Sequence, residues 1–442
     1  MSVLWTSGDI AAATSGACKG TWTVNGVSID SRTVKKGDLF VALKGPNFDA
    51  HDFVADALKK GAGGALVSHI PPRTPSEKLV LVNDTFKALE DLGRASRARS
   101  KAKVIAVTGS VGKTGCKEAL RQVLSVQKAS FASTGSYNNH WGVPLSLSQM
   151  PQATAYGIFE LGMNHAGELG PLSKMARPHI ALITGIAAVH LGHFASLEEI
   201  ARAKAEIFEG LEADGTAVLN GDDAYYNVLK DCAVKTGVKN IARFGKGADF
   251  EARLEEFSLN DESSTVHASI LGKKLNYAIG APGEHWVMNS LAVLLCAALA
   301  GADVQRAAES FKDLKLATGR GGTEHINFVG GAFTLIDESY NASPVAVEAA
   351  IRVLGRRKPE GDGRRILVLG DMKELGDQSQ KLHEALAAPI QEAGIAKVYA
   401  TGEHMRCLLE ALPESLRGGW RATSSELAPQ VAENIRHGDV VT

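Results

Sequence analysis

The chain has 442 residues, a length that predicts about three domains. Hydrophobic residues make up 45% of it and charged residues 22%, which is ordinary globular usage and argues against an intrinsically disordered chain. The 48 basic and 49 acidic side chains leave a formal net charge of -1. We therefore expect no nucleic-acid partner, because proteins that bind nucleic acid neutralise its phosphates with an excess of Lys and Arg.

The five cysteines are scattered and form no CxxC pair, which is typical of reduced thiols in a cytosolic protein. Residues 1–10 lack the basic and apolar segments of a signal peptide. The most apolar stretch, Val287–Ala300, is shorter than the ~20 residues that cross a bilayer, so we expect a buried helix there. No coiled-coil pattern calls for a partner. We accordingly expect a cytoplasmic monomer without a membrane span.

Short apolar runs near the N-terminus predict strands at 38–43, 65–67 and 79–82. A basic stretch, residues 94–103, follows them, and we interpret it as a solvated helix end. The strongly apolar run from Val104 then begins a new strand. A domain boundary is therefore expected near residue 102, so that the first domain comprises residues 1–102.

From Val104 onward, β-branched runs end at glycines and are followed by helical stretches, as at Gly109, Gly370 and Gly402. This alternation predicts mainly parallel sheets covered by helices, an α/β fold. The glycine-rich joint 318–322 predicts a second boundary. It separates a central domain, 103–317, from a Rossmann-like C-terminal domain, 318–442. We expect the final residues, 438–442, to open another strand.

A glycine-rich loop between a strand and a helix is the strongest functional signal. It consists of Thr108, Gly109, Ser110, Val111, Gly112, Lys113 and Thr114. The backbone N–H groups of such a loop bind phosphate, the Lys113 ammonium neutralises it, and the Thr114 hydroxyl binds Mg²⁺. Val107 stands where the usual Walker spacing has a glycine, and the following helix is expected over 117–127. A kinase, a switch GTPase, a motor or a ligase could each carry this loop.

Three further residues are candidates for the same site. Glu160 ends a predicted strand, where its carboxylate could bind Mg²⁺. His190 follows a strand predicted at 181–184, and Lys204 lies in a helix predicted at 197–211. From the residues alone, each also has a structural reading: Glu160 as a solvated strand end, and His190 and Lys204 as structural side chains.

Together these segments resemble the Mur ligase family, and the resemblance covers nearly the whole chain. It rests on the phosphate loop and on short motifs at Asp30–Thr33, Phe48–Phe53, Tyr137–Asn139, Gly142–Pro144, Glu160–Glu168, His190–Phe208, Asn289, Gly319–Arg320, Asp337–Pro344 and Leu369–Gly376. Within the family, the segments 160–168, 339–342 and 370–372 are similar to those of the member that adds D-alanyl-D-alanine.

The resemblance implies an ATP-dependent ligase that joins D-alanyl-D-alanine to UDP-N-acetylmuramoyl-tripeptide through an acyl phosphate, in peptidoglycan synthesis. It implies four catalytic residues: Lys113, His190, Lys204 and Arg320. It also implies two Mg²⁺ ions, one bound by Thr114 and Glu160 and the other served by His190 and Lys204. Because Mg²⁺ prefers oxygen ligands, the resemblance implies a carbamylated Lys204.

The resemblance also assigns the nucleotide contacts. It implies that Asn289 and Tyr340 pack near the base, that Asp337 binds the ribose, and that Arg320 reaches the γ-phosphate from the third domain. Domain closure would then be part of the mechanism. Read without the family, Arg320 could be an interdomain loop charge and Asp337 a helix N-cap.

The substrate contacts are implied in two regions. The UDP end would contact residues of the first domain: Ser31, Arg32, Asn47 and His51. Asn138 and Asn139 would lie near the reacting centre, and Asn341, Asp371 and Glu374 would form the D-alanyl-D-alanine pocket. Read without the family, residues 30–32 predict only a turn.

The chain departs from the family pattern at several positions, including Val111, Gly115 and His140.

Four alternatives remain beside the main hypothesis. The ligase that adds the third residue typically has an Asp-Asn-Pro-Arg motif, which this sequence lacks, and folylpolyglutamate synthase lacks a UDP-binding first domain. A P-loop switch protein would form no amide product, and a scaffold would need no phosphate loop. The third residue of the tripeptide, lysine or diaminopimelate, stays open.

Overall fold

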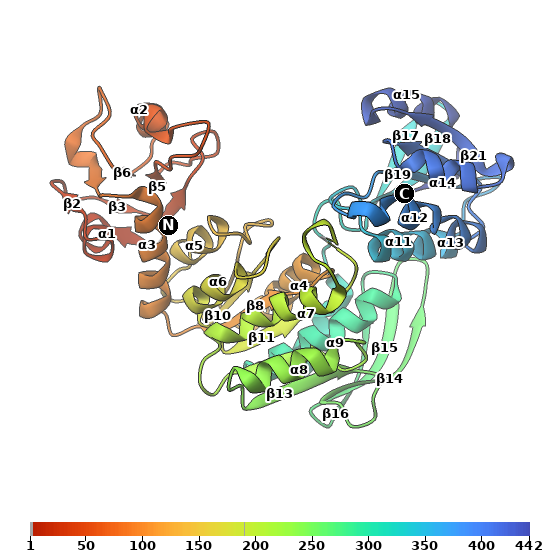
Figure 1. The fold of residues 1–442 in the computed structure, drawn as a ribbon, viewed down its shortest axis with the longest axis horizontal. Coiled ribbons are helices and arrows are strands. Elements are labelled where there is room, and N and C mark those ends of the chain that lie inside the picture. The colour runs from red at the N-terminus through yellow and green to blue at the C-terminus, as the bar shows by residue number, and fades with distance from the viewer. Residues whose placement is uncertain (1–2, 190) are drawn as a thin grey trace.

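The structure, a computed structural model, describes residues 3–189 and 191–442 (Figure 1). It contains three large sheets that follow one another along the chain, with five, nine and six strands. In Figure 1 the nine-stranded sheet lies between the other two. Helices cover the sheets, which confirms the predicted α/β class. Among the described residues, no helix has both the length and the apolar character needed to cross a membrane.

The N-terminal sheet has the order β2-β7-β6-β5-β4, with β4 to β7 parallel and β2 antiparallel. Its strands are β2 (Ala17–Cys18), β4 (Gly26–Ser28), β5 (Asp38–Val41), β6 (Gly64–Val67) and β7 (Leu79–Leu81). A separate antiparallel pair is formed by β1 (Trp5–Thr6) and β3 (Thr23–Val24), and the helices are α1 (Ser7–Thr14), α2 (Val54–Lys59) and α3 (Thr85–Arg99). The three strands predicted here are confirmed, with bounds that differ by one or two residues.

Helix α3 connects this sheet to the central domain, and it packs on both α1 and α5 (Gly142–Ser148). The Asp84 carboxylate caps its start by accepting hydrogen bonds from the N–H groups of Phe86 and Lys87. The interpretation of the basic stretch as a solvated helix end is wrong for Arg97, which is only 5% exposed. The Arg97 guanidinium donates to the carbonyl of Ala176 at 2.7 Å, a partner too distant in sequence for local patterning to reveal.

The central sheet has the order β16-β15-β14-β13-β12-β11-β8-β10-β9. Its strands are β8 (Lys103–Thr108), β9 (Ser130–Ala132), β10 (Tyr156–Glu160), β11 (Ile180–Ile183), β12 (Thr216–Asn220), β13 (Asn240–Gly245), β14 (Ala252–Leu259), β15 (Ser264–Ile270) and β16 (Lys273–Ile279). The strands from β9 to β14 pair in parallel, whereas β14, β15 and β16 form an antiparallel meander.

Strand β8 explains why this sheet is covered on both faces. Ile105 and Val107 point into one apolar cluster, and Val104 and Ala106 point into another, because alternate residues of a strand face opposite sides. The first cluster includes α4 (Lys113–Ser125), α9 (Glu284–Leu299) and α10 (Val304–Glu309). The second includes α5, α6 (Leu169–Ala176), α7 (Leu197–Ala205) and α8 (Tyr226–Lys235). Helix α9 is the buried helix predicted at 287–300.

The C-terminal sheet has the order β17-β18-β22-β19-β20-β21, parallel except for the β17–β18 hairpin. Its strands are β17 (Gly322–Phe328), β18 (Gly331–Asp337), β19 (Arg365–Gly370), β20 (Lys397–Thr401), β21 (Arg417–Arg421) and β22 (Val440–Val441). Its helices are α11 (Pro344–Arg356), α12 (Ser379–Glu384), α13 (Ala387–Glu392), α14 (Met405–Ala411) and α15 (Ser424–Asn434). The strand expected within 438–442 is confirmed, and it lies inside the sheet between β18 and β19.

Candidate active site

The phosphate loop joins β8 to α4, which confirms the predicted arrangement of strand, loop and helix. Gly109 has φ of +143° and Gly112 has φ of +86°, conformations that L side chains rarely adopt. A Cβ atom at Gly109 would also collide with the Thr184 hydroxyl. The helix begins at Lys113 rather than at the expected residue 117, since Gly112 forms its N-cap.

The polar groups of this loop are largely held within the protein. The Lys113 amine donates to the carbonyls of Gly109 at 2.7 Å and Ser110 at 3.1 Å, and burial lowers its pKa. The Ser110 hydroxyl donates to the Ala187 carbonyl, and the Val111 carbonyl accepts from the Thr184 hydroxyl. The buried Thr108 hydroxyl has no hydrogen-bond partner among the described residues.

Glu160 lies beside this loop because β10 pairs in parallel with β8, in a register that sets Glu160 opposite Val107. Its side chain is buried, with 1% exposure, so the solvated-strand-end reading is wrong. One carboxylate oxygen, Oε1, accepts from Nδ2 of Asn138 at 2.7 Å, and Oε2 has no partner among the described residues. A buried, unpaired carboxylate oxygen is costly unless a cation meets it, so this group fits a metal ligand.

The two asparagines predicted near the reacting centre differ in their contacts. Asn138 faces Glu160, as described above. The Asn139 side chain instead accepts from the N–H groups of Trp141 and Gly142 at the start of α5. Of these two asparagines, only Asn138 therefore forms a hydrogen bond with the predicted metal ligand.

Lys204 lies near the end of α7 and is almost completely buried, with 2% exposure. Burial, and then the charge of Lys113, hold the pKa of Lys204 well below its ordinary value. The helix predicted at 197–211 is divided, because α7 ends at Ala205 and a 3-10 turn covers Glu206–Gly210. His190, predicted beside Lys204, lies outside the described residues.

A cavity of about 470 Å³ separates the phosphate loop from the C-terminal domain. It is lined by Thr114, Glu118, Gly135, Ser136, Ala317, Thr318, Gly319, Arg320, Ser339 and Tyr340. The Arg320 guanidinium lies 4.2 Å from the centroid of the Tyr340 ring, and its Nη2 donates to the Thr114 hydroxyl at 3.4 Å. Arg320 thus reaches the loop from the third domain, and its contact with the γ-phosphate stays a prediction.

The remaining nucleotide candidates border the same region. Asn289 packs on the phosphate loop, since a Cβ atom at Gly112 would come within 3.2 Å of its amide oxygen. Asp337 ends β18 and accepts from the N–H groups of Gly319 and Ser339. The N-cap alternative for Asp337 is wrong, because Ser343 occupies that position in α11. Hydrogen bonding to Ser339 lowers the pKa of Asp337.

Sequence reasoning missed Glu338, the next residue. It is half-buried, and burial raises its pKa to about 7, against the opposing effect of Arg320. It also missed Lys117, a fully buried lysine on α4. A signal was available for Lys117, because it interrupts the apolar face formed by Cys116, Leu120 and Leu124.

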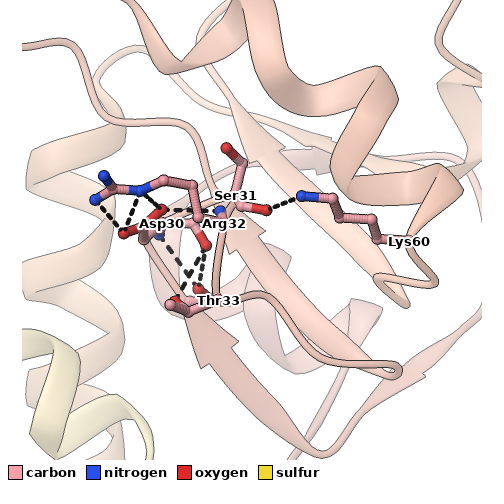
Figure 2. A network of polar contacts seen from close by, with 6 residues as sticks. Asp30, Ser31, Arg32, Thr33 and Lys60 are labelled. Atoms are coloured by element: carbon pink, nitrogen blue, oxygen red, sulfur yellow. Dashed lines mark hydrogen bonds and ion pairs between the residues drawn. The ribbon is translucent and has the colours of Figure 1, made fainter.

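The candidates of the first domain lie apart from the phosphate loop, in a different sheet. Arg32 is exposed and forms a two-pronged pair with Asp30, and Lys60 donates to the Ser31 carbonyl at 2.7 Å (Figure 2). This network holds the turn that sequence reasoning predicted at 30–32. Hydrogen bonding to Arg32 lowers the pKa of Asp30.

The other two candidates of this domain have contrasting environments. Asn47 is exposed in the loop that precedes α2. His51 is buried, and both its ring nitrogens are engaged: Nδ1 with Asp49 at 2.5 Å and Nε2 with the Ser68 N–H at 2.8 Å. A direct ligand contact of His51 stays a prediction, and its contacts within the protein already account for its burial.

The three candidates for the amine pocket lie at loops of the C-terminal domain. Asn341 is exposed beside Tyr340. The Asp371 carboxylate accepts from the N–H groups of Met405 at 2.9 Å and His404 at 3.3 Å, which caps α14. The Glu374 carbonyl accepts from the Gly192 N–H at 3.1 Å and so joins this loop to the central domain.

Comparisons with known proteins cover the whole of this architecture. Three family models match: the Mur ligase family, catalytic domain, over residues 23–99, the Mur ligase middle domain over 107–297, and the Mur ligase, glutamate ligase domain over 323–442. A UDP-N-acetylmuramoyl-tripeptide–D-alanyl-D-alanine ligase from Rickettsia prowazekii is 35% identical, across 99% of this chain and 96% of the relative. The protein of that name from Bacillus subtilis is 34% identical, across 95% and 89%.

Solved structures agree. MurF from Acinetobacter baumannii superposes with a TM-score of 0.83 at 30% identity, covering 99% of this chain and 95% of the other. MurF ligase from Thermotoga maritima, in complex with ADP, superposes with a TM-score of 0.76 at 26% identity, covering 95% and 93%. The chain therefore belongs to the Mur ligase family.

Proposed function

We propose that this protein is the ATP-dependent ligase that joins D-alanyl-D-alanine to UDP-N-acetylmuramoyl-tripeptide in peptidoglycan precursor synthesis. The observation that carries the proposal is the convergence at Thr114, where a phosphate loop is met by Arg320 from the third domain. The substrates follow from the relatives, which bear this activity in their names and match the chain along almost its whole length.

The reaction joins a carboxylate to an amine, which is uphill in water. Transfer of the γ-phosphoryl group of ATP to the tripeptide carboxylate gives an acyl phosphate, the amine attacks its carbonyl carbon, and phosphate leaves. The protein's task is to align the reactants and neutralise charge. Lys113 of the phosphate loop and Arg320, which reaches that loop from the third domain, suit the γ-phosphate.

The metal sites would draw on few protein ligands. Among the described residues no group of three or more His, Cys, Asp or Glu could hold a metal ion, so Thr114 and Glu160 would act together with phosphate oxygens and water. Bound Mg²⁺ supplies charge neutralisation for the transferred phosphoryl group. A second ion would be served by His190 and Lys204.

Lys204 suits carbamylation because burial depresses its pKa, which favours the neutral form of the amine. That amine can attack carbon dioxide, forming a C–N bond and releasing a proton to give a carbamate anion with two oxygen ligands. Intact-mass measurement, with Lys204→Ala as the reference, tests for the added carbon dioxide. An active enzyme without the modification would contradict this assignment.

The three domains would divide the substrates. In the first, 1–102, Ser31, Arg32, Asn47 and His51 would serve the UDP end. In the central domain, 103–317, Asn289 would lie near the base, with Asn138 and Asn139 near the tripeptide. In the third, 318–442, Tyr340 and Asp337 would hold the nucleoside of ATP. The D-alanyl-D-alanine dipeptide would be bound there by Asn341, Asp371 and Glu374. ATP and a UDP-linked precursor are cytoplasmic metabolites, so we assign a cytoplasmic location, and the monomer stays an expectation from the sequence.

The test is phosphate release from ATP by the purified protein with UDP-N-acetylmuramoyl-tripeptide and each candidate amine in turn. We expect phosphate release that depends on D-alanyl-D-alanine, together with a UDP-linked pentapeptide seen by mass spectrometry. Equal release with a single amino acid, or without any amine, would contradict the proposed substrate. Parallel assays with lysine-containing and diaminopimelate-containing tripeptides would identify the third residue.

A further inference from the structure

Lys117 has no role in the steps described so far, yet it is the second lysine of the helix that begins at the phosphate loop. Its side chain is fully buried, with 0% exposure. An unpaired buried ammonium group is strongly destabilising, so its partners must compensate for the lost hydration. Nζ donates to the carbonyls of Ser133 at 2.8 Å and Gly135 at 2.6 Å, and it lies 3.0 Å from Oε1 of Glu118.

The two carbonyls belong to the segment 133–138, which follows β9 and leads toward α5. Both turn inward to the same ammonium group, and Gly135 has φ of +52°, which lets the chain turn between them. The segment has no strand or helix of its own. The Lys117 amine therefore anchors the middle of this segment, while its two ends are held by the bonds from the Ser133 N–H to the Ile158 carbonyl and from the Gly162 N–H to the Asn138 carbonyl.

This segment holds Glu160 at two points. The Ser133 hydroxyl accepts from the Glu160 N–H at 3.4 Å, and Nδ2 of Asn138 donates to the Glu160 carboxylate at 2.7 Å. Each end of the segment thus contacts the residue whose second carboxylate oxygen is unpaired. Gly135 and Ser136 also line the interdomain cavity, together with Thr114.

We propose that Lys117 is a positioning residue of the active site: its ammonium group fixes the segment 133–138, which in turn orients the Glu160 carboxylate toward the metal. The residue acts through this segment and touches neither substrate nor metal. The inference rests on the proposed metal role of Glu160. Residues that orient metal ligands typically contribute about 10- to 100-fold to metal affinity or activity.

Lys117→Met tests the role, because methionine fills a similar volume but leaves both carbonyls without a donor. Arg121→Met is the matched control: Arg121 lies one turn further along α4, is about half exposed, and pairs with Glu118. Lys117→Arg retains donors that can reach the same carbonyls, so it should recover part of the function.

Two measurements on metal-free protein separate positioning from stability. In hydrogen–deuterium exchange, we expect faster exchange of the 133–138 amides in K117M and unchanged exchange in the first and third domains. In a titration with Mn²⁺ alone, followed by electron paramagnetic resonance, we expect binding about 10- to 100-fold weaker in K117M, near wild type in R121M, and intermediate in K117R.

Several outcomes would overturn the inference. One is a K117M variant that binds Mn²⁺ as tightly as the wild type. Another is a K117M variant that binds Mn²⁺ more weakly but shows no faster exchange of the 133–138 amides. If K117M does not fold, Ser133→Ala serves in its place, because it removes only the hydroxyl that accepts from the Glu160 N–H. Unchanged Mn²⁺ binding by that variant would contradict the proposal that the segment 133–138 orients Glu160. A wild type that binds Mn²⁺ but forms no pentapeptide would refute the proposed ligase function and leave the Lys117 result intact.

Discussion

Glu160 combines burial, a negative charge and an oxygen that has no partner among the described residues. Glu160→Gln keeps the shape of the side chain, and its amide oxygen can still accept from Asn138. We expect Mn²⁺ or Mg²⁺ binding at least about 10-fold weaker, because the charged oxygen ligand is lost. We also expect an equal or higher free energy of unfolding, because a buried unpaired charge is removed.

Metal titration and urea denaturation of the same Glu160→Gln samples would check the expected loss of metal affinity and the expected equal or higher free energy of unfolding. Asp371→Asn serves as the comparison, because the Asp371 carboxylate caps α14 and should affect stability rather than metal binding. Unchanged metal affinity in Glu160→Gln would remove this residue from the metal site.

Glu338 gives a pH dependence of stability. Its pKa in the folded protein is about 7, above the ordinary 4.5, because burial disfavours the carboxylate. The folded state therefore holds the proton more tightly than the unfolded state. The stabilisation of the folded state that results from this proton binding is lost as the pH rises through about 7. We expect Glu338→Gln to raise the free energy of unfolding by roughly 1 kcal/mol or more at about pH 8, and by much less at about pH 5.

Thermal or urea unfolding at the two pH values checks the Glu338 prediction. Glu324→Gln, an exposed glutamate on the neighbouring strand β17, is the control and should show little pH-dependent gain. A Glu338→Gln variant whose stability parallels the wild type at both pH values would contradict the raised pKa.

Residue positions were predictable where a local rule applied. Glu160 could be placed because it ends an apolar run beside the strand of the phosphate loop. The partners of a side chain were not predictable, because they come from distant segments. The ligand contact of His51 stays a prediction, and its hydrogen bonds with Ser68 and Asp49 could not be predicted from the sequence. Glu338 was missed because its burial depends on tertiary packing, whereas Lys117 was missed although it interrupts the apolar face of its helix.

At the scale of elements, α3 joins two domains through a buried arginine. Arg97 donates from Nε to the Ala176 carbonyl and from Nη2 to the Arg177 carbonyl, each at 2.7 Å, and pairs with Glu212. Arg97→Met leaves these carbonyls without their donor and Glu212 with one cation fewer. We expect a loss of about 2 to 4 kcal/mol in the free energy of unfolding.

The control for Arg97 lies one turn earlier on the same helix. Arg94 is about half exposed and pairs only with Glu90 and Asp91 of α3 among the described residues. Arg94→Met should change the free energy of unfolding by less than about 0.5 kcal/mol. Urea denaturation of both variants checks the contrast, and equal losses would show that burial of Arg97 is not what matters.

The elements themselves were largely predictable, but their order in the sheets was not. Alternating strands and helices indicated parallel sheets, and most strands follow that rule. The antiparallel meander of β14, β15 and β16 was missed. Strand β16 nevertheless has the alternation of exposed and buried residues that is typical of a strand with one solvent-exposed face. The insertion of β22 between β18 and β19 required long-range pairing that no local pattern contains.

At the scale of the whole molecule, the C-terminal domain meets the central domain at several places, which include the Gly192–Glu374 hydrogen bond and the cavity where Arg320 reaches Thr114. Another is the turn between β14 and β15, where Oε1 of Glu262 lies 3.5 Å from Nη1 of the buried Arg357. Arg357 also donates to the Thr323 hydroxyl at 2.9 Å within its own domain. The Glu262–Arg357 pair therefore acts between domains, whereas the Thr323 bond does not.

This pair should bias the orientation of the third domain without affecting its folding. Glu262 is largely exposed, so the pair contributes at most about 1 kcal/mol and is weakened by salt. Glu262→Gln should shift the ratio of domain orientations by about two- to fivefold at low salt, and high salt should reproduce the shift in the wild type. Glu255→Gln, which alters a pair within the same hairpin, should leave the orientation unchanged. Energy transfer between dyes on the central and C-terminal domains measures the distribution, and identical distributions for wild type and Glu262→Gln at low salt would exclude this contact as a determinant of domain closure.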